Sequence, residues 1–577
     1  MYKKLRQIIL SFCFLLLFLA SSWALLRADF FRFHDFTQGA RIVEMSHAVQ
    51  DNHFPVIWSE NLGYGYGMPL FEFYGPLPYY VGAVVYLLGF SLIDSIKILF
   101  FISTLVTIFG SYYLGKKLFG TTAGLLTSAA VTLAPYRAVN LYVRGALSES
   151  WGIMMLPLIL LGIIKVIKRE KFGWVIVVVS IFILLISHNL TALIFLPLSV
   201  IFAIGFFFIH NTTYADIRKN ILATLSQLVG SYTLGFLLSS FYIVPAFLEK
   251  GFTRLESTVL GDYFDYKLHF VGLRQFITEN WGYGGSTYGP EDGISFYLGF
   301  GQILGIFFCI YLLFLGVRTA YLKQKKLVIA ENSLIYILIL ALTALALLLA
   351  TAKTQFIWEQ ISLLSFLQFP WRYLSAGIVF LGLAVGGMVY LLPNKSYRFL
   401  YTGIFICILL FNAQYFRPEE FSSNLSEYYY ADTNQIRTQM SKTLPDYIPV
   451  QIQTTEISPV ALEGQVLYCQ VLQNCEFSSE LITNKVQEKT VKITTQVAEN
   501  VVFSIGNFPG WSATVDNSVV PVTTSAEGYV QVLVPPGDHV VKVYLQQTTV
   551  RKTAALTSVF SLVIFLSVYF WYYKKEC

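Results

Sequence analysis

The chain has 577 residues, of which 55% are hydrophobic and only 13% are charged. This balance is typical of a polytopic membrane protein and excludes a water-soluble globular protein. The formal net charge of +6 could point to an anionic partner, but the basic residues lie mostly at the ends of hydrophobic segments. Membrane topology explains them, so nucleic-acid binding is not expected.

Hydrophobic stretches long enough to cross a membrane recur along the chain. A helix needs roughly 17 to 25 residues to span about 30 Å of hydrocarbon, and twelve stretches reach or approach this length. The first follows basic residues, as in a signal peptide, but because many spans follow it we expect an uncleaved anchor. The predicted spans are 8–26, 96–115, 121–136, 151–167, 172–187, 190–209, 220–246, 295–316, 332–351, 372–392, 398–415 and 553–573.

The apolar stretch 76–93 is predicted not to cross. If it crossed, the later basic clusters, such as Lys116 with Lys117, would lie outside the cell, against the positive-inside rule. Pro76 and Pro78 also disfavour a continuous spanning helix. We therefore expect a juxtamembrane or re-entrant helix, cytoplasmic N- and C-termini, and an outer loop over 27–95.

Residues 416–550 differ from the rest of the chain. They hold seven basic and fourteen acidic residues and alternate as short strands, for example over 528–534. The turn 535–539 then predicts a hairpin. We expect an extracytoplasmic β-sandwich, where an oxidising compartment would permit a disulfide between Cys469 and Cys475. The predicted domains are a membrane domain over 1–415, a β-rich domain over 416–550, and a last span with a cytoplasmic tail over 551–577.

The loop 27–95 is rich in polar and ionisable residues. Asp35, preceded by His34, is followed by a short amphipathic stretch that would hold the carboxylate near the outer surface of the bilayer. A solvated loop aspartate is the ordinary alternative, and position alone favours it.

Further ionisable residues occur where outer loops meet predicted spans. Arg144 and Glu149 could bind an anionic headgroup, or could equally snorkel and cap a helix. His188 and Asn189 interrupt two apolar spans, where ionisable groups are functional candidates, although a turn also needs polar residues. Arg372 follows an aromatic pair at a helix start, and interfacial anchoring explains the tryptophan there better than the arginine.

The order of these motifs resembles that of bacterial membrane glycosyltransferases of the GT-C superfamily. The motifs in the first outer loop are Asp35, Pro55 to Trp58, Gly63 to Pro69 and Phe73 to Tyr80. Together with 144–149, 187–189 and 369–372 they resemble the membrane proteins named "6-pyruvoyl-tetrahydropterin synthase-related". The C-terminal part, with Gly510-Trp511 and 534–537, is similar to the outer domain of YfhO-type glycosyltransferases.

This resemblance implies a GT-C-like helical membrane domain that transfers a sugar, with inversion, at the outer face of a bacterial cytoplasmic membrane. The donor would be a polyprenyl-phosphate sugar and the acceptor a hydroxyl of an envelope glycan, polymer or lipid. Asp35 would be the catalytic base. The candidate substrate-binding residues are His34, Arg41, Glu44, Tyr74, Arg144, Glu149, His188, Asn189 and Arg372.

Two matters stay open at this point. The superfamily often has an Asp-Asp or Asp-Glu pair in the first outer loop, whereas Asp35 is followed by Phe36, so the involvement of a divalent metal is undecided. Glu44 or Glu149 could replace the missing partner. Two other functions also remain: a flippase or transporter of lipid-linked glycans, which commonly shows internal repeats that are not evident here, and a non-enzymatic envelope scaffold acting through 416–550.

Overall fold

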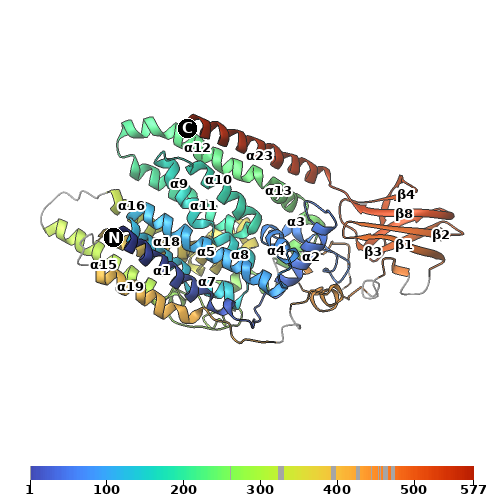
Figure 1. The fold of residues 1–577 in the computed structure, drawn as a ribbon, viewed down its shortest axis with the longest axis horizontal. Coiled ribbons are helices and arrows are strands. Elements are labelled where there is room, and N and C mark those ends of the chain that lie inside the picture. The colour runs from blue at the N-terminus through green and yellow to red at the C-terminus, as the bar shows by residue number, and fades with distance from the viewer. Residues whose placement is uncertain are drawn as a thin grey trace.

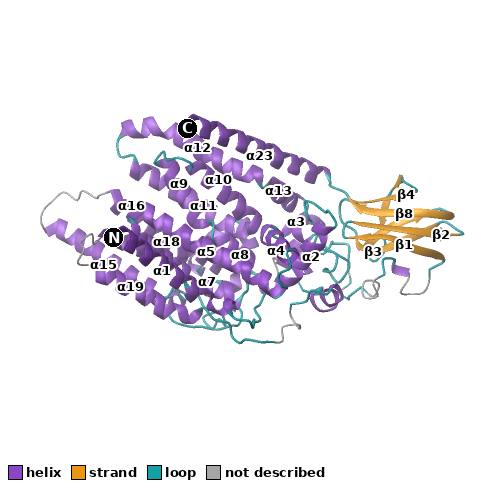
Figure 2. Ribbon diagram, viewed as in Figure 1, coloured by secondary structure: helices purple, strands orange, loops and turns teal. Residues whose placement is uncertain are grey.

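The computed structural model shows a helical body with a β-domain at one end (Figures 1 and 2). The two chain ends lie in the part of the helical body that is farther from the β-domain, and α2, α3 and α4 lie between the body and the β-domain (Figure 1). The residues described are 2–259, 262–322, 331–391, 398–423, 429–443, 445–452, 454, 456–458, 465–469 and 475–576.

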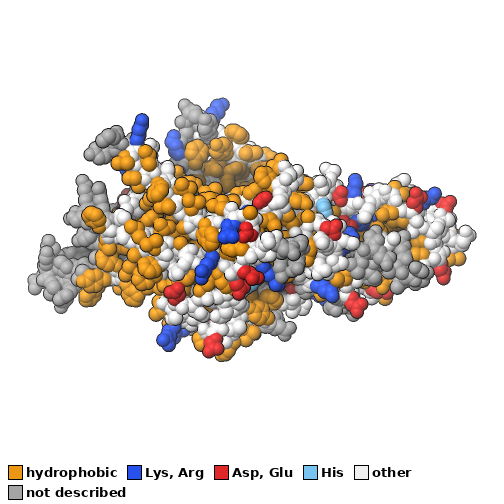
Figure 3. All heavy atoms as spheres, turned by 60° about the horizontal axis from the view of Figure 1, so that its bottom comes forward, with side chains coloured by type: hydrophobic (Ala, Val, Ile, Leu, Met, Phe, Trp, Pro, Cys, Tyr) orange, Lys and Arg blue, Asp and Glu red, His pale blue; other side chains and the backbone are white. Residues whose placement is uncertain are grey.

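Eight helical segments of the described chain are long and apolar enough to cross a membrane. They confirm a multi-pass helical membrane protein. The segments are Lys4–Leu26, Leu92–Phe119, Leu147–Ile167, Asn189–His210, Tyr214–Leu238, Glu331–Leu349, Pro370–Tyr390 and Thr549–Tyr572. Figure 3 shows the matching surface, on which hydrophobic side chains cover much of the helical body and charged side chains gather toward the β-domain.

The helices follow one another in the order of the chain. Their bounds are α1 Tyr2–Ser22, α2 Gln38–Gln50, α3 Leu70–Phe73, α4 Leu77–Leu87, α5 Leu92–Phe119, α6 Thr121–Thr132, α7 Pro135–Ala138, α8 Leu147–Ile153, α9 Leu156–Ile167, α10 Gly173–Ser187, α11 Asn189–His210, α12 Tyr214–Leu238, α13 Ser240–Leu248, α14 Leu255–Val259, α15 Phe300–Leu322, α16 Glu331–Leu349, α17 Gln355–Gln360, α18 Leu374–Leu391, α19 Arg398–Asn412, α20 Thr433–Gln435 and α23 Thr549–Glu576.

Four of the twelve predicted spans are not among the eight long helices. Three of them fall on α6, α10 and α19, which have 12, 15 and 15 residues. At 1.5 Å per residue, 15 residues rise only about 22 Å, less than the hydrocarbon thickness. For α6 and α19 the apolar run continues past the residue where the helix ends, whereas α10 matches its predicted bounds and is simply short. The fourth predicted span falls on α15.

The stretch 76–93 forms α4, which has only 11 residues. A helix of this length rises about 16 Å and is too short to cross. Its Gly82 lies against Ile42 of α2 and Leu99 of α5, so α4 packs between these two helices. Its placement relative to a bilayer remains a prediction.

The β-domain consists of two antiparallel sheets. Their orders are β1-β2-β8-β4-β5 and β3-β7-β6. The strands are β1 Phe477–Lys485, β2 Glu488–Thr495, β3 Glu499–Gly506, β4 Trp511–Val515, β5 Ser518–Val520, β6 Val522–Thr524, β7 Tyr529–Val534 and β8 Gly537–Leu545. Cys469 and Cys475 are joined by a disulfide just before β1.

The predicted hairpin over 528–545 is wrong in its pairing, although both strands exist. β7 pairs with β3 and β6, whereas β8 pairs with β2 and β4. The turn after Val534 therefore carries the chain from one sheet to the other. A true hairpin joins β4 to β5 through Asp516 and Asn517, which both have positive φ, as a two-residue hairpin turn of the primed type requires.

Candidate active site

A cavity of about 820 Å³ opens where the loops that are predicted to lie on the outer side, called the outer loops below, meet the helical body. Its walls come from the first outer loop, the turns before α8 and α11, the segment before α18, the loop after α13, and residues that precede the β-domain. The polar residues that line it are His34, Asp35, Arg41, Tyr74, Arg144, Glu149, His188, Asn189, Lys250, Tyr263, Ser286, Gln368, Arg372, Thr443, Asp446 and Tyr447. Distant parts of the sequence thus supply one site.

Asp35 is held by several donors on its own loop. Oδ1 accepts a hydrogen bond from Thr37 at 2.7 Å. Oδ2 accepts from Gln38 Nε2 at 2.7 Å and from Arg41 Nη1 at 3.0 Å. Tyr74 donates to the same oxygen at 3.3 Å. These contacts fix the carboxylate while about a quarter of its side chain, 26%, remains accessible from the cavity side.

Arg41 of α2 holds the Asp35 carboxylate in place. Its guanidinium lies over the Tyr74 ring at 4.1 Å and also donates to Tyr79 at 3.1 Å. Because α2 buries Arg41 almost completely, at 1% exposure, the cation orients Asp35 rather than sampling solvent. The amphipathic stretch expected after Asp35 is therefore the helix that positions it.

The backbone joins Asp35 to Arg144. The amide of Asp35 donates to the Arg144 carbonyl at 2.9 Å, and that of His34 donates to Val143 at 3.0 Å. Gly145 makes this approach possible, because a Cβ there would come within 2.0 Å of the Phe33 ring and its φ is +62°. His34 is tied down further by its Nε2, which lies 2.8 Å from the Tyr283 carbonyl oxygen.

Glu149 lies close to two arginines at the cavity wall. Its Oε2 lies 2.7 Å from Arg144 Nη1 and 3.9 Å from Arg372 Nε. Tyr136 donates to Oε1 at 2.5 Å, and the carboxylate is buried at 2% exposure. Two guanidinium groups face one carboxylate, so this cluster carries an excess positive charge that an anion can balance.

His188 and Asn189 stand at the turn between α10 and α11. This turn packs closely against Gly75 of the first outer loop. A Cβ at Gly75 would lie 2.0 Å from the Ser187 carbonyl oxygen, so only glycine fits there. Burial lowers the pKa of His188 to about 3, so the imidazole is neutral at physiological pH. Its Nδ1 accepts from the Thr191 amide at 3.2 Å, which leaves the proton on Nε2. His188 is therefore available as a neutral hydrogen-bond donor.

Glu44 does not line the cavity. It accepts hydrogen bonds from Ser59 at 2.7 Å and from the amide of Asn61 at 2.9 Å, so it shapes the loop that follows α2. Of the predicted substrate-binding residues, the other eight line the cavity.

The far half of the cavity is apolar. Its walls come from α11, α12 and α13, which contribute aliphatic and aromatic side chains. These residues are Leu190, Leu193, Leu196, Phe236, Ile243 and Phe247. A single cavity therefore joins a charged head region to an apolar region, as an amphiphilic ligand requires.

The lining residues that the sequence analysis missed include Thr443, Asp446 and Tyr447. They belong to the region assigned to the β-domain, well after the last outer loop of the membrane part. No motif marks them, because a lone Asp-Tyr pair in a polar segment has no distinguishing pattern. Only the folding of 443–447 back onto the first outer loop brings them into the cavity.

The described residues do not fit a metal site. Among them, no three His, Cys, Asp or Glu side chains come together as ligands. Glu149 already faces Arg144, and Asp35 accepts from four neighbours. No chemical step is therefore assigned to a divalent ion.

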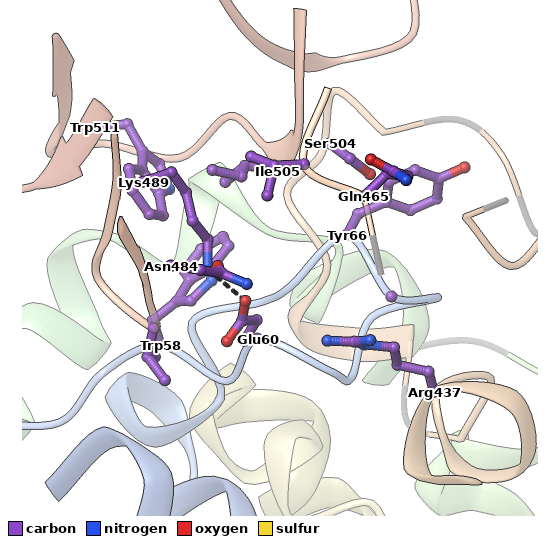
Figure 4. Close-up of a pocket in the computed structure, with 13 residues that line it drawn as sticks. Trp58, Glu60, Tyr66, Arg437, Gln465, Asn484, Lys489, Ser504, Ile505 and Trp511 are labelled. Carbon is purple, nitrogen blue, oxygen red and sulfur yellow. Dashed lines mark hydrogen bonds and ion pairs between the residues drawn. The ribbon is translucent and has the colours of Figure 1, made fainter. Parts of the chain in front are cut away.

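A second, smaller cavity lies between the first outer loop and the β-domain (Figure 4). There Lys489 of β2 reaches across to form an ion pair with Glu60, and the Trp58 and Trp511 rings meet edge to face at 5.4 Å. Burial raises the pKa of Glu60, but the Lys489 ammonium outweighs it and holds that pKa below its usual value. These groups satisfy one another, so this interface docks the β-domain onto the loop.

Sequence comparisons give little information about the function of the chain. No family model matches the chain. A curated relative, an uncharacterized protein of Lactococcus lactis subsp. cremoris (strain MG1363), is 26% identical over 234 residues, covering 38% of this chain and 36% of the relative. The chain thus matches about a third of the length of that curated relative.

Solved membrane glycosyltransferases are similar to the chain in overall fold. An Archaeoglobus fulgidus oligosaccharyltransferase is 10% identical with a TM-score of 0.42, over 73% of this chain and 57% of that one. The mycobacterial arabinofuranosyltransferase AftD is 13% identical with a TM-score of 0.42, over 72% and 27%. ArnT from Cupriavidus metallidurans, bound to undecaprenyl phosphate, is 12% identical with a TM-score of 0.29, over 68% and 79%. At these scores the likeness indicates no substrate or activity for this chain.

Proposed function

We propose that the chain is a glycosyltransferase that moves a sugar from a polyprenyl-phosphate donor to an acceptor hydroxyl in the cell envelope, at the outer face of the membrane. The observation that carries the proposal is the cavity itself, in which a fixed carboxylate, an excess of positive charge and an apolar wall meet. Each of these three features matches one part of the reaction.

The donor's phosphate fits the cluster around Glu149. Arg144 and Arg372 supply two guanidinium groups for one carboxylate, and arginine binds phosphate oxygens through paired hydrogen bonds. The neutral His188, with its proton on Nε2, adds a donor that costs no charge repulsion. The polyprenyl tail would lie along the apolar half of the cavity, where Leu190, Leu196 and Phe247 exclude water.

The reaction then needs one base and one stabilised leaving group. The acceptor oxygen attacks the anomeric carbon, the bond from that carbon to the phosphate oxygen breaks, and its electron pair remains on the phosphate. Asp35 takes the hydroxyl proton on Oδ1, which among the described residues accepts only from Thr37. Arg144 and Arg372 stabilise the charge that gathers on the departing phosphate. A direct displacement of this kind inverts the anomeric centre.

The test uses purified full-length protein in lipid nanodiscs with a panel of undecaprenyl-phosphate sugars and an envelope extract as acceptor. We expect one donor to be consumed, with release of undecaprenyl phosphate, and we expect Asp35→Asn to abolish this turnover because the amide cannot accept the proton. The matched control is Asp29→Asn, an acidic residue of the same loop that pairs with Arg27 outside the cavity.

The outcomes separate the competing functions. Normal turnover in Asp35→Asn would remove the proposed base. Movement of a lipid-linked sugar between leaflets without any transfer product would identify a flippase instead. If no donor is consumed and only deletion of 416–550 gives a phenotype, the protein is a scaffold.

A further inference from the structure

The segment that carries Asp446 is held firmly against the outer loops. The amide of Arg254 donates to the Ile448 carbonyl at 3.1 Å, and that of Val450 donates to Phe252 at 3.0 Å. On the other side, the Tyr447 ring stacks on Phe73 with a centroid separation of 6.0 Å. Backbone and aromatic contacts therefore fix this short stretch as a wall of the active-site cavity.

Asp446 is the acidic residue of this wall, and it lines the cavity at 8% exposure. The ring of the adjacent Tyr447 meets the Tyr74 ring at 6.4 Å, and the Arg41 guanidinium lies over that same Tyr74 ring at 4.1 Å. Among the described residues, none contributes a hydrogen bond to its carboxylate. Arg41 meanwhile already donates to Asp35 and Tyr79.

A carboxylate that lines a cavity takes its remaining hydrogen bonds from what fills the cavity. Polar groups removed from water are normally hydrogen-bonded, and leaving one without donors costs free energy. Burial raises the pKa of Asp446 to about 6, against the opposing effect of Arg41, so the group is ionised at neutral pH. Its carboxylate oxygens can then accept hydrogen bonds from the molecule that occupies the cavity.

We propose that Asp446 is a second substrate-binding carboxylate, which accepts hydrogen bonds from hydroxyl groups of a polyol or sugar acceptor and so presents the neighbouring hydroxyl to Asp35. The inference rests on the proposed function and goes beyond it, because it assigns a residue and the chemistry of the acceptor. The acceptor must carry at least one hydroxyl besides the one that attacks.

The charge distribution assigns Asp446 to the acceptor rather than to the donor phosphate. Asp446 is adjacent to Tyr447, whose ring meets the Tyr74 ring at 6.4 Å, and Tyr74 donates to the base Asp35. The phosphate belongs with Arg144 and Arg372 around Glu149, and a phosphate placed against Asp446 would meet a like charge. The base and the hydroxyl-binding carboxylate therefore share one side of the cavity.

Two small acceptors test this assignment directly. Glycerol carries adjacent hydroxyls and propan-1-ol carries only one, so only glycerol can bind Asp446 while it is attacking. The purified protein in nanodiscs receives the donor that it consumes together with both alcohols at equal concentration, and the glyceryl and propyl glycosides are quantified. The ratio of the two products does not depend on how much of a variant folds.

We expect the full-length protein to favour glycerol by roughly tenfold or more, as a hydrogen bond to a charged group allows. Asp446→Asn should lower this ratio by roughly tenfold, because an amide is a weaker acceptor, and Asp446→Ala should lower it at least as far. The matched control is Asp538→Asn, an exposed carboxylate on β8 far from the cavity lining, which should keep the original ratio.

Each outcome decides the matter. An unchanged product ratio in both Asp446 variants overturns the inference and leaves the proposed function standing. Donor consumption without preference for glycerol in the unmodified protein overturns it equally. If the unmodified protein consumes no donor at all, the proposed function fails and this inference fails with it.

Discussion

Two buried ion clusters of the molecule have opposite compositions. The cavity cluster sets Arg144 and Arg372 around Glu149, with two cations for one carboxylate. The root cluster, where the last helix leaves the β-domain, sets Glu72 and Glu249 around Arg551, with distances of 2.9 and 2.6 Å. One cluster has an excess of positive charge and the other an excess of negative charge.

The two clusters differ in how their excess charge is balanced. The root cluster is partly satisfied by its neighbours, since Thr548 donates to Glu249 at 2.6 Å and Arg551 donates to the Pro509 carbonyl at 3.0 Å. Burial raises the pKa of Glu72 to about 8, and a protonated carboxyl there removes the extra negative charge. The cavity cluster has no such internal remedy, because an arginine does not release its proton. Its excess charge faces the cavity, where an anionic ligand can meet it.

The largest expected effect comes from breaking the root cluster. Arg551→Met would leave two buried carboxyl groups without their cation, and loss of one partner of a buried pair costs about 3–5 kcal/mol. We expect a marked fall in the melting temperature of the detergent-purified protein. The triple variant Glu72→Gln, Glu249→Gln, Arg551→Met removes all charges together and should recover most of the loss. Equal melting temperatures for Arg551→Met and the unmodified protein would show that this cluster does not stabilise the fold.

Substitutions in the cavity cluster should instead lower the rate of sugar transfer. Removing one donor to a charged transition state typically costs about 3–4 kcal/mol, or a hundredfold to a thousandfold in rate. We expect Arg144→Gln to lower kcat/KM for the consumed donor by that factor, and Arg144→Lys to restore only part of it because lysine cannot make paired contacts. Arg27→Gln, which lies in an exposed pair with Asp29, is the control and should have no effect. A fall in melting temperature that accounts for the whole loss of activity would instead give Arg144 a structural role.

The sequence predicts the class of the molecule and several of the charged residues that line the cavity, for a physical reason. A charge that survives among apolar helices must face a cavity, a partner or the surface, so Asp35, Arg144, His188 and Arg372 stand out from their neighbours. Glu44 stands out in the same way, yet it binds the amide of Asn61, because burial alone does not say which partner satisfies a carboxylate.

What the sequence could not predict depends on long-range contacts. Asp446 enters the cavity only because the stretch 448–450 hydrogen-bonds to the loop after α13, and no local pattern encodes that pairing. The hairpin error has the same origin. A turn residue pattern fixes where the chain reverses, but the sheet that each strand joins depends on partners elsewhere, as β8 shows by pairing with β2 and β4.

The last expected effect is a pH dependence that isolates Glu72. Its pKa lies near 8 in the folded protein against an ordinary value of 4.5, so the folded state holds a proton that the unfolded state releases. The free energy of unfolding should therefore fall as pH rises from about 4.5 to 8, by linkage. Glu72→Gln cannot titrate and should lose this slope.

The neighbours of Glu72 make a paired comparison necessary. Glu249 and Arg551 contact it directly, and burial lowers the pKa of the nearby His53 to about 4, which by itself makes stability rise between pH 4 and 6.5. Because His53 is present in both proteins, its contribution cancels in the difference. The melting temperature of the unmodified protein minus that of Glu72→Gln should thus decrease steadily from pH 5 to pH 8. A difference that stays constant over this range would mean that Glu72 is already ionised, and that the root cluster carries its excess negative charge without a proton.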